Sequence, residues 1–337
     1  MNSKHLLLAS AAILSLAACN KTVTEPVQSQ FPEDGVMRFT TNLVDPTAVT
    51  TRASITGSDV NQNGQQFQVK IVNPTSAQYS YFNTVQFDGT EWTPVNRMLW
   101  QNDQQSITVT AAYKQGKAFS DYDFIVGANL TVAADQSTEA KLKQQDLLTM
   151  PTKTIANPSI EETLMQNGKL VINFYHALTK LDVTLDLANE FYKVDPKLNN
   201  ASDITEFTIN GTNTGYQFKA METANENYGT VTVTASTPAD ILANQCAFTA
   251  ATAADMHSYA TYEAIVVPQQ IAAGALTVSF KIGTRSFSWT NIETITLEQG
   301  KHYTLPLTVG YDTVTLNARA FSVTSWEDQP GDNLGTE

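Results

Sequence analysis

The feature that most constrains the fold is an alternating apolar pattern in the middle of the chain, at residues 169–187. Its second half alternates Leu181, Val183, Leu185 and Leu187 with polar residues, and this period of two is typical of a half-buried β-strand. The first half also alternates, but its phase is shifted by one residue. Because neither Gly nor Pro accompanies the shift, we interpret it as a β-bulge or a short irregular turn. A strand this strong at mid-chain predicts that a second β-domain opens here.

Length, composition and charge limit the class of protein. A chain of 337 residues exceeds the usual size of a single core, so two domains are expected. Acidic residues outnumber basic ones by 33 to 20, and such a surface repels nucleic acids and anionic lipid headgroups. The hydrophobic content of 42% is enough for a core. Together with abundant Thr, Val, Tyr and Phe, these values predict an exported, soluble, all-β protein without a nucleic-acid partner.

The N-terminus has the form of a secretory signal. Lys4 and His5 precede an apolar run at residues 6–18, which is too short to span a bilayer. The run ends in Leu-Ala-Ala followed by Cys19, and this order resembles the lipobox of bacterial lipoproteins. We therefore predict cleavage before Cys19 and a covalent lipid anchor, such as palmitate, on this residue. The alternative is an ordinary signal peptide with an accidental cysteine.

The mature chain contains many short strand patterns separated by turn signals, which is typical of β-sandwiches. The first strand pattern covers residues 36–44 and ends at Asp45 and Pro46. A helix is expected at residues 137–150, and the Ala-rich residues 238–258 are expected to form a short helix or a loop. We divide the chain into a signal peptide (1–18), a tether (19–35), an N-terminal β-sandwich (36–168) and a C-terminal β-sandwich with terminal strands (169–337).

The sequence contains no recognisable catalytic or metal-binding motif, so we expect no enzyme activity, cofactor or metal. The histidines after the signal are not at metal-ligand spacing; they are His176, His257 and His302. Asp121 and Asp123 lack the further oxygen ligands and the glycine of a calcium loop, so an acidic surface turn is favoured.

Two further reactive residue types are interpreted as structural. His176 lies in the central strand pattern, and we interpret it as a packed or hydrogen-bonded histidine because no partner acid or nucleophile is identifiable. Cys246 is interpreted as a small buried hydrophobic residue.

The tryptophans allow two interpretations. They could form a platform for carbohydrate, or they could anchor the core of β-sandwiches. Their spacing does not separate the two interpretations. The residues concerned are Trp92, Trp100, Trp289 and Trp326.

Several motifs, taken together and in order, resemble the Bacteroidetes fimbrillin family, the type V pilins and their lipoprotein relatives. They cover most of the mature chain and lie at residues 16–19, 51–53, 146–148, 173–181, 262–270, 297–303 and 323–326. The resemblance implies two transthyretin-like β-sandwich domains with Greek-key type connections, exported as a lipoprotein to the outer membrane. The polar tail after Trp326 departs from the pattern, which leaves open whether the protein is a stalk, tip or accessory subunit.

The resemblance also implies a route of assembly. In polymerising members, an arginine-specific protease removes the lipid and the first strand, and the open groove accepts a strand from a neighbouring subunit. The matching position is Arg52, so cleavage would separate Arg52 from Ala53 and release the first strand. Arg38 lies within that strand and would be protected by pairing. The implied partners are other fimbrial subunits, and the implied donor lies at residues 314–326.

Two functions from different classes remain open at this point. The first is a structural or accessory fimbrial subunit that assembles by strand exchange at the cell surface for adhesion. The second is an outer-membrane-anchored surface lipoprotein that stays uncleaved and binds a glycan or host ligand. The second is suggested by the tryptophans and by the many Asn, Gln and Thr side chains.

Overall fold

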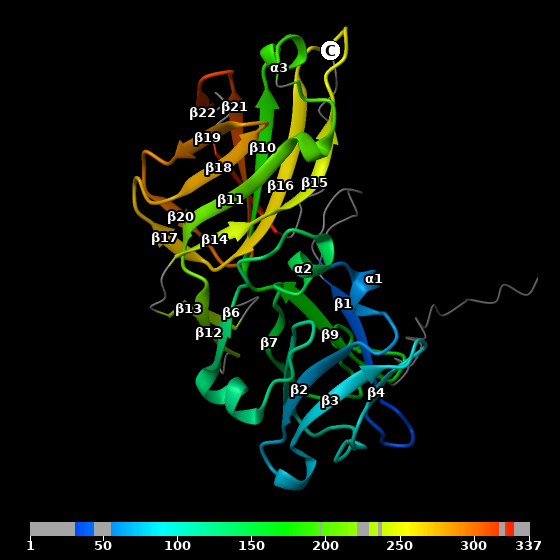
Figure 1. Cartoon of the computed structure of the whole chain (residues 1–337). Helices are drawn as coiled ribbons and strands as arrows, with labels where there is room; N and C mark the ends of the chain where they lie inside the picture. Colours follow the sequence, from blue (N-terminus) through cyan, green and yellow to red (C-terminus); the bar gives the residue numbers. More distant parts are fainter. Residues whose placement is uncertain are drawn as a thin grey trace, which may run out of the picture.

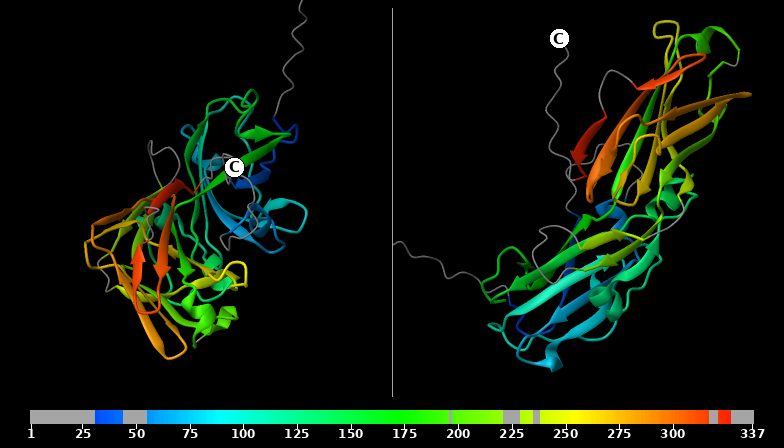
Figure 2. Two further views of the ribbon diagram at one scale, coloured as in Figure 1. Left: turned by 90° about the horizontal axis from the view of Figure 1, so that it is seen from above. Right: turned by 90° about the vertical axis from the view of Figure 1, so that its left-hand side faces the viewer.

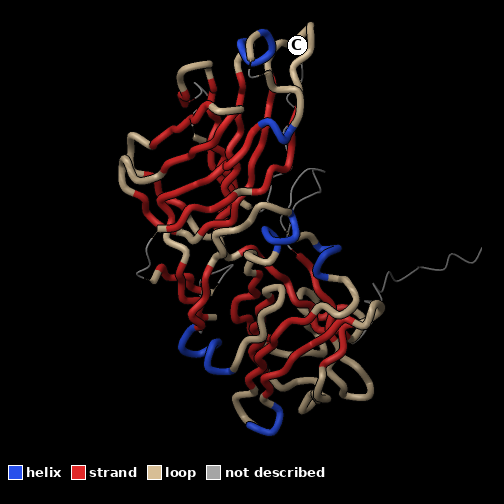
Figure 3. The backbone as a smooth tube through the Cα atoms, viewed as in Figure 1, coloured by secondary structure: helices blue, strands red, loops and turns tan. Residues whose placement is uncertain are grey.

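The computed structural model describes residues 31–43, 55–195, 197–220, 229–234, 238–316 and 321–326. Strands dominate these residues, which confirms the all-β prediction. They form sheets of eight, six, four, three and two strands, arranged in a lower lobe and an upper lobe (Figures 1 and 3). Figure 2 shows the same two lobes from two further directions. None of the helices in the described ranges is long and apolar enough to cross a membrane.

The lower lobe is built from the eight-stranded sheet, in the order β1-β4-β3-β2-β5-β7-β9-β8. An additional pairing between β1 and β9 closes this sheet into a ring. Alternate residues of each strand then point into the ring, where Phe67, Val69 and Ile71 of β2 join the core. Its strands are β1 (Phe39–Leu43), β2 (Gln66–Val72), β3 (Tyr81–Phe87), β4 (Trp92–Pro94), β5 (Ile107–Tyr113), β7 (Leu148–Ile155), β8 (Met165–Gln166) and β9 (Lys169–His176).

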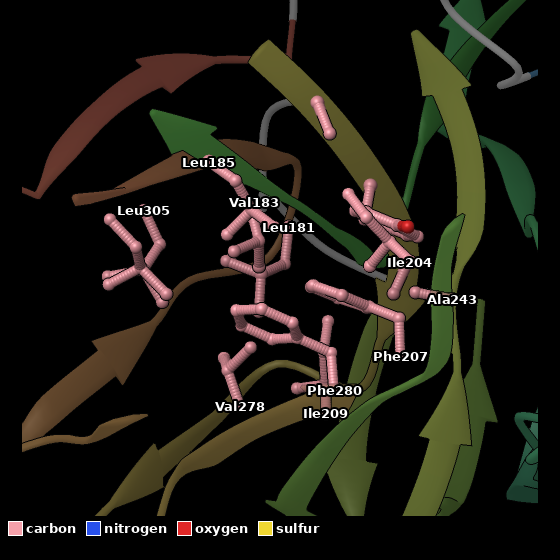
Figure 4. Packing of buried hydrophobic residues seen from close by; sticks show 14 of the residues in the cluster. Leu181, Val183, Leu185, Ile204, Phe207, Ile209, Ala243, Val278, Phe280 and Leu305 are labelled. Carbon is pink, nitrogen blue, oxygen red and sulfur yellow. The ribbon is translucent and has the colours of Figure 1, made fainter. Parts of the chain in front are cut away.

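The upper lobe is a sandwich of the six-stranded and four-stranded sheets. Leu181, Val183 and Leu185 of one sheet face Phe207 and Phe280 of the other (Figure 4). The six-stranded sheet contains β15 (Asn244–Thr249), β16 (Ser258–Val266), β10 (Thr179–Leu187), β21 (Lys301–Val309), β22 (Val314–Leu316) and β23 (Ser322–Ser325). The four-stranded sheet contains β14 (Ala239–Leu242), β11 (Ile204–Thr212), β18 (Thr277–Ile282) and β19 (Arg285–Thr290).

Two small sheets complete the fold. The three-stranded sheet joins β13 (Thr230–Val233) and β12 (Gly215–Lys219) to β6 (Ala128–Thr131), which comes from the first half of the chain. The two-stranded ribbon pairs β17 (Gln269–Ile271) with β20 (Ile295–Leu297). A third apolar cluster contains residues of both lobes, including Ala112, Phe218 and Trp326. The division of the chain at residue 168 into two folding units stays a prediction.

The helices are short, and one of them corrects an expectation. They are α1 (Gly57–Val60), α2 (Glu139–Lys143), α3 (Glu190–Lys193), the 3₁₀ turns Ala77–Tyr79 and Ala201–Asp203, and the π-turn Asp123–Gly127. The helix expected at residues 137–150 was therefore wrong beyond α2, because Leu148 already belongs to β7. Pairing of β7 with β5 outweighs the local helical spacing of the leucines.

The shift of phase in the mid-chain pattern is explained by a change of sheet. Strand β9 ends at His176, β10 begins at Thr179, and the two strands belong to different sheets. Of the two interpretations of the shift, the β-bulge was therefore wrong. The short irregular turn is confirmed at residues 177–178. The phase changes because each strand turns its apolar side toward a different core.

The Ala-rich residues 238–258 also differ from the expectation. They contain β14 and β15 instead of a helix or a simple loop. Both strands are edge partners of longer strands, β14 of β11 and β15 of β16. Pairing with a formed sheet therefore overrides the weak strand preference of these small residues.

Candidate functional site

The first strand is the piece that closes the lower lobe. Five residues of β1 pair in parallel with β9, from Phe39 opposite Leu170 to Leu43 opposite Phe174. On its other side, β1 pairs with β4 only where Phe39 lies opposite Trp92. Just before β1, Val36 forms an isolated bridge with Leu99, and Met37 N donates a hydrogen bond to Met98 O. Within β1 itself, the pairing with β9 is therefore the longer one, and the pairing with β4 is a single residue pair.

The side chains of β1 complete the lower core. Phe39 is 1% exposed, and its ring meets the Phe67 ring edge to face with centroids 6.0 Å apart. Thr41 donates a hydrogen bond to Asn61 Oδ1, which also accepts one from Trp92 Nε1. Full burial of one large apolar side chain contributes about 1.5–3 kcal/mol, so the core depends on an occupied β1 position.

A hollow of about 450 Å³ lies beside the start of β1 and is lined on its other side by β4. The Arg38 guanidinium, just before β1, holds both carboxylate oxygens of Asp34, at 2.9 and 2.6 Å. This contact keeps the pKa of Asp34 well below its usual range. The Arg38 backbone oxygen accepts a hydrogen bond from Leu170 N, so the side chain and the backbone of Arg38 are both engaged. The charged residues that line the hollow are Arg38, Arg97, Lys169 and Glu91.

The predicted processing residues fall outside the described part of the chain. Cys19, Arg52 and Ala53 belong to residues that the structure does not describe, so their roles stay predictions. The described chain resumes at Ile55, which is 1% exposed in the lower core. Helix α1, with its capping box, follows directly. A chain that starts at Ala53 would therefore keep Ile55 and α1 as its anchor in the lower lobe.

The C-terminal segment is held at the junction of the two lobes. Strands β22 and β23 both pair with β21, but at different positions along its length. Trp326, which follows β23, is 5% exposed. Its ring stacks on the His176 ring with centroids 4.2 Å apart and planes 5° apart. The end of the C-terminal segment is therefore packed against the last residue of β9.

His176 has a structural environment, in agreement with the interpretation favoured from the sequence. Its Nδ1 lies 2.8 Å from Asp146 Oδ2, and the two side chains are 2% and 0% exposed. This acid partner could not be identified from the sequence, because it lies 30 positions away. His176 is therefore a packed histidine, held between the Asp146 carboxylate and the Trp326 indole ring.

A buried charged cluster on the six-stranded sheet was not predicted. Lys180 Nζ lies 2.8 Å from Glu263 Oε1, with both side chains 1% exposed. His302 Nε2 lies 2.8 Å from Asp182 Oδ2. These residues belong to β10, β16 and β21, so the contacts connect three adjacent strands. The alternation of the sequence placed Asp182 on a polar side, and only the assembled sheet shows that this side is covered.

The acidic turn near residue 122 takes part in surface contacts. Asp121 pairs with Lys70, and Asp123 accepts a hydrogen bond from Ser120 N. Within the described ranges, no cluster of side chains suited to a metal ion occurs. Both aspartates therefore have partners within the protein that account for their positions.

Cys246 is only half-buried, so the expectation of full burial was too strong. Its Sγ contacts Thr261 O. Partial burial, with the nearby carboxylate of Glu263, raises the pKa of this thiol to about 12. The thiolate form is therefore scarce at neutral pH.

The structure separates the four tryptophans. Trp92, Trp100 and Trp326 are 4–5% exposed and belong to apolar cores, as core anchors do. Trp289 is half-buried and lines a pocket of about 470 Å³ in the upper lobe. Trp289 also packs against the upper core, and it is the least buried of the four.

Comparisons with known proteins agree with this architecture. A candidate cell adhesion protein from Bacteroides uniformis is 16% identical, with a TM-score of 0.55, and the match covers 88% of this chain and 99% of that one. A second candidate cell adhesion protein, from Bacteroides ovatus, is 14% identical, with a TM-score of 0.54. This match covers 87% of the present chain and 98% of the other protein. At these identities the likeness concerns the fold alone. A search among curated proteins gives no match.

The model of the fimbrillin-like family matches residues 51–326, which is most of the chain. This range includes all of β2 to β23 and leaves out β1. The chain belongs to the fimbrillin-like family.

Proposed function

We propose that this protein is a structural fimbrial subunit that is exported as a lipoprotein and joins other subunits by strand exchange. Membership of the fimbrillin-like family implies a place at the cell surface or in a fimbrium, in association with other fimbrial subunits. The finer steps are lipidation of Cys19, cleavage between Arg52 and Ala53, and replacement of β1 by a donated strand. A non-enzymatic role is part of the proposal.

The observation that carries the proposal is the asymmetric closure of the lower lobe by β1. Its loss would uncover the backbone edge of β9 and the core side of Phe67 and Phe174, whose ring centroids lie 5.6 Å apart. An extended strand from another subunit would restore both the main-chain hydrogen bonds and the apolar contacts. A strand of five residues, with five residue pairs to β9 and one to β4, is short enough for such replacement.

The donated strand is proposed to come from residues 314–326. This segment supplies β22 and β23, which both pair with the outer edge of β21. Strand β22 pairs with one end of β21, and β23 pairs with the other end. Their pairings are short, with three and four residue pairs. Few contacts of this kind have to be broken before the segment can leave its own subunit.

The test is arginine-specific proteolysis of the purified full-length chain. Cleavage should give a new N-terminus at Ala53 and ladders that resist SDS, because exchanged strands are locked by apolar burial and many hydrogen bonds. Arg52→Lys keeps the charge but removes the protease site, so this variant should give neither product. Arg97→Lys, at an exposed arginine, is the matched control and should behave like wild type. Ladders from Arg52→Lys equal to those of wild type would overturn the processing step.

The anchor is tested separately in cells that carry out lipoprotein export. Metabolic labelling with palmitate should mark the wild-type chain and should not mark Cys19→Ser. Equal labelling of both chains would place the lipid elsewhere. Because the anchor precedes cleavage, this result is independent of the assembly test.

A further inference from the structure

The pocket beside Trp289 lies on the open side of the upper sandwich, away from the β1 position in the lower lobe. Strand β19 ends the four-stranded sheet, and β22 and β23 end the six-stranded sheet. Between these ends and the ribbon strand β20 lies a volume of about 470 Å³, within the range of about 300–1,000 Å³ that small-molecule sites occupy. The labels β19, β20 and β22 mark this side of the upper lobe in Figure 1.

The floor of the pocket is aromatic. Tyr303 and Phe321 stack with ring centroids 5.3 Å apart and planes 24° apart, and Trp289 faces the same space from β19. Trp289 is half-buried, and its indole N–H has no hydrogen-bond partner among the described residues. An aromatic side chain with an apolar face and an unused donor is suited to a ligand that has both apolar C–H faces and polar groups.

The rim of the pocket supplies polar groups that the described part of the chain leaves unbonded. Thr294 and Thr296 are exposed, and within the described chain their hydroxyls have no partner. Glu293 and Glu298 add two carboxylates, whereas the described lining contains no Lys, Arg or His. Such a rim accepts and donates hydrogen bonds but repels anions.

The rim loop is fixed in place before any ligand arrives. Asn291 donates from Nδ2 to Ala272 O and Glu293 O. Its Oδ1 accepts a hydrogen bond from Leu276 N. The next residue, Ile292, is nevertheless 88% exposed. A rigid loop that presents a large apolar side chain beside a pocket reduces the entropy lost on binding and adds contact area.

We infer that this pocket binds a neutral saccharide, with a sugar ring lying on Trp289 and its hydroxyls bonded by Thr294, Thr296 and the two carboxylates. A sugar ring combines an apolar C–H face with hydroxyls that both donate and accept hydrogen bonds. The aromatic floor and the polar rim match this combination. Among the described lining residues, the two carboxylates disfavour sialylated or sulfated sugars.

The pocket shares no residue with the β1 position, so cleavage at Arg52 does not itself remove a residue that lines it. One wall is formed by Leu316, Phe321 and Val323, which belong to the segment proposed as donor. These three described residues line the pocket in the uncleaved chain. The test consequently uses the full-length, uncleaved protein.

A panel of probes distinguishes the chemical classes of ligand. Lactose, maltose, cellobiose and N-acetyllactosamine represent neutral sugars, sialyllactose and a heparin disaccharide represent acidic ones, and a peptide of residues 36–44 represents an added strand. Binding is measured by calorimetry and by tryptophan fluorescence. At least one neutral sugar should bind more tightly than the acidic probes and change the fluorescence. That change reports on Trp289, because the other three tryptophans are buried.

Variants distinguish the pocket from the rest of the surface. Trp289→Ala should weaken binding of that sugar by about tenfold or more and abolish the fluorescence change. Thr294→Ala with Thr296→Ala should weaken binding in a chain that keeps its melting temperature, since both residues are exposed. Thr290→Ala, on β19 but outside the pocket lining, should bind like wild type.

Three results would each overturn the inference. They are a flat response across all saccharides, tighter binding of the acidic sugars, and binding of the peptide alone in a manner sensitive to Trp289. The last result would assign the pocket to strand addition. Each of these outcomes leaves the proteolysis test of Arg52 unaffected.

Discussion

At the residue scale, the contact between Trp326 and His176 links the C-terminal segment to the lower lobe. Trp326 N also donates a hydrogen bond to Gly300 O, while Asp146 fixes the His176 ring through its Nδ1. A buried tryptophan at the end of a short strand contributes far more than the exposed residues of that strand. The contact therefore holds β23 on its own subunit, and its loss would free the segment proposed as donor.

Trp326→Ala is expected to loosen β23 selectively. Truncation of a large buried aromatic side chain costs about 3–5 kcal/mol, and here the loss is concentrated at the end of a strand with four residue pairs. Hydrogen exchange of the β23 and β21 amides should accelerate, while exchange in β2 and β5 stays slow. Val323→Ala, at a residue 54% exposed on the same strand, is the control and should change little. Unchanged exchange in β23 of Trp326→Ala would show that the stacking contact does not hold the segment.

At the element scale, α1 anchors the chain just after the predicted cleavage position. Thr56 N donates to Asp59 Oδ2, and Lys143 Nζ of α2 donates to Asp59 Oδ1 at 3.0 Å. Burial by itself raises the pKa of Asp59, but the hydrogen bonds from Thr56 and Lys143 outweigh it, and the pKa is lowered. The carboxylate form is therefore the one that stabilises α1 and its contact with α2.

Asp59→Asn is expected to lower the free energy of unfolding by about 1–2 kcal/mol near neutral pH. The folded-state pKa lies below the unfolded value of about 3.9, so the folded protein binds fewer protons. The contribution is present above the unfolded pKa and is lost as the pH falls through the folded pKa. Urea unfolding at several pH values should show the difference between the two proteins shrinking below about pH 4. Asp103→Asn, at an exposed aspartate, is the control. If the difference in free energy of unfolding between wild type and Asp59→Asn grew as the pH fell, the Asp59 carboxylate would not be the stabilising form.

At the scale of the whole molecule, the lower lobe depends on an occupied β1 position whereas the upper lobe does not. Phe39 of β1 is part of the lower core inside the eight-stranded sheet. The upper core is formed around Val183, Phe207 and Phe280 and contains no residue of β1. Removal of β1 should therefore destabilise the lower lobe and leave the upper lobe folded.

This difference can be tested with a strand supplied in solution. After arginine-specific cleavage, a peptide of residues 36–44 should raise the melting temperature of the cleaved chain and suppress ladder formation, because it refills the position between β9 and β4. The same peptide with Phe39→Asp is the matched control and should do neither, since it places a charge in the lower core. Equal effects of both peptides would contradict the view that the β1 position is the acceptor.

Much of the strand content could be predicted from local pattern. The alternation of Phe67, Val69 and Ile71 predicts β2. Asp88 with Gly89 predicts the hairpin between β3 and β4, where Gly89 has a φ of 99°. Both signals are local, because a period of two and a positive φ depend only on neighbouring residues.

The incorrect elements have a common physical cause. The helix at residues 137–150 was wrong because leucine spacing alone does not distinguish a helix from a turn followed by a buried strand. The strands within residues 238–258 were missed because small residues carry little pattern, and pairing with β11 and β16 decides their structure. In both places, contacts with distant strands outweigh the local preference.

For the candidate site, the sequence predicted which segments are involved but not which of their residues are in contact. It predicted a first strand followed by an arginine-containing linker, and it named four tryptophans without ranking them. The parallel pairing of β1 with β9, the contact of His176 with Asp146, and the pocket around Trp289 all join residues far apart in the chain. Contacts of this kind depend on how the sheets close, and no local pattern encodes them.

The sequence by itself determined the all-β class, the mid-chain alternation and the absence of recognisable catalytic motifs, because these follow from residue type and a period of two. Only the tertiary structure decided that residues 169–187 serve two sheets, with β9 closing the lower lobe against β1 and β10 lying inside the upper sandwich. The physical reason is that the inward face of a strand is defined by the core that it meets. A change of phase in the sequence shows that the face changes, and the packing of the two lobes shows why.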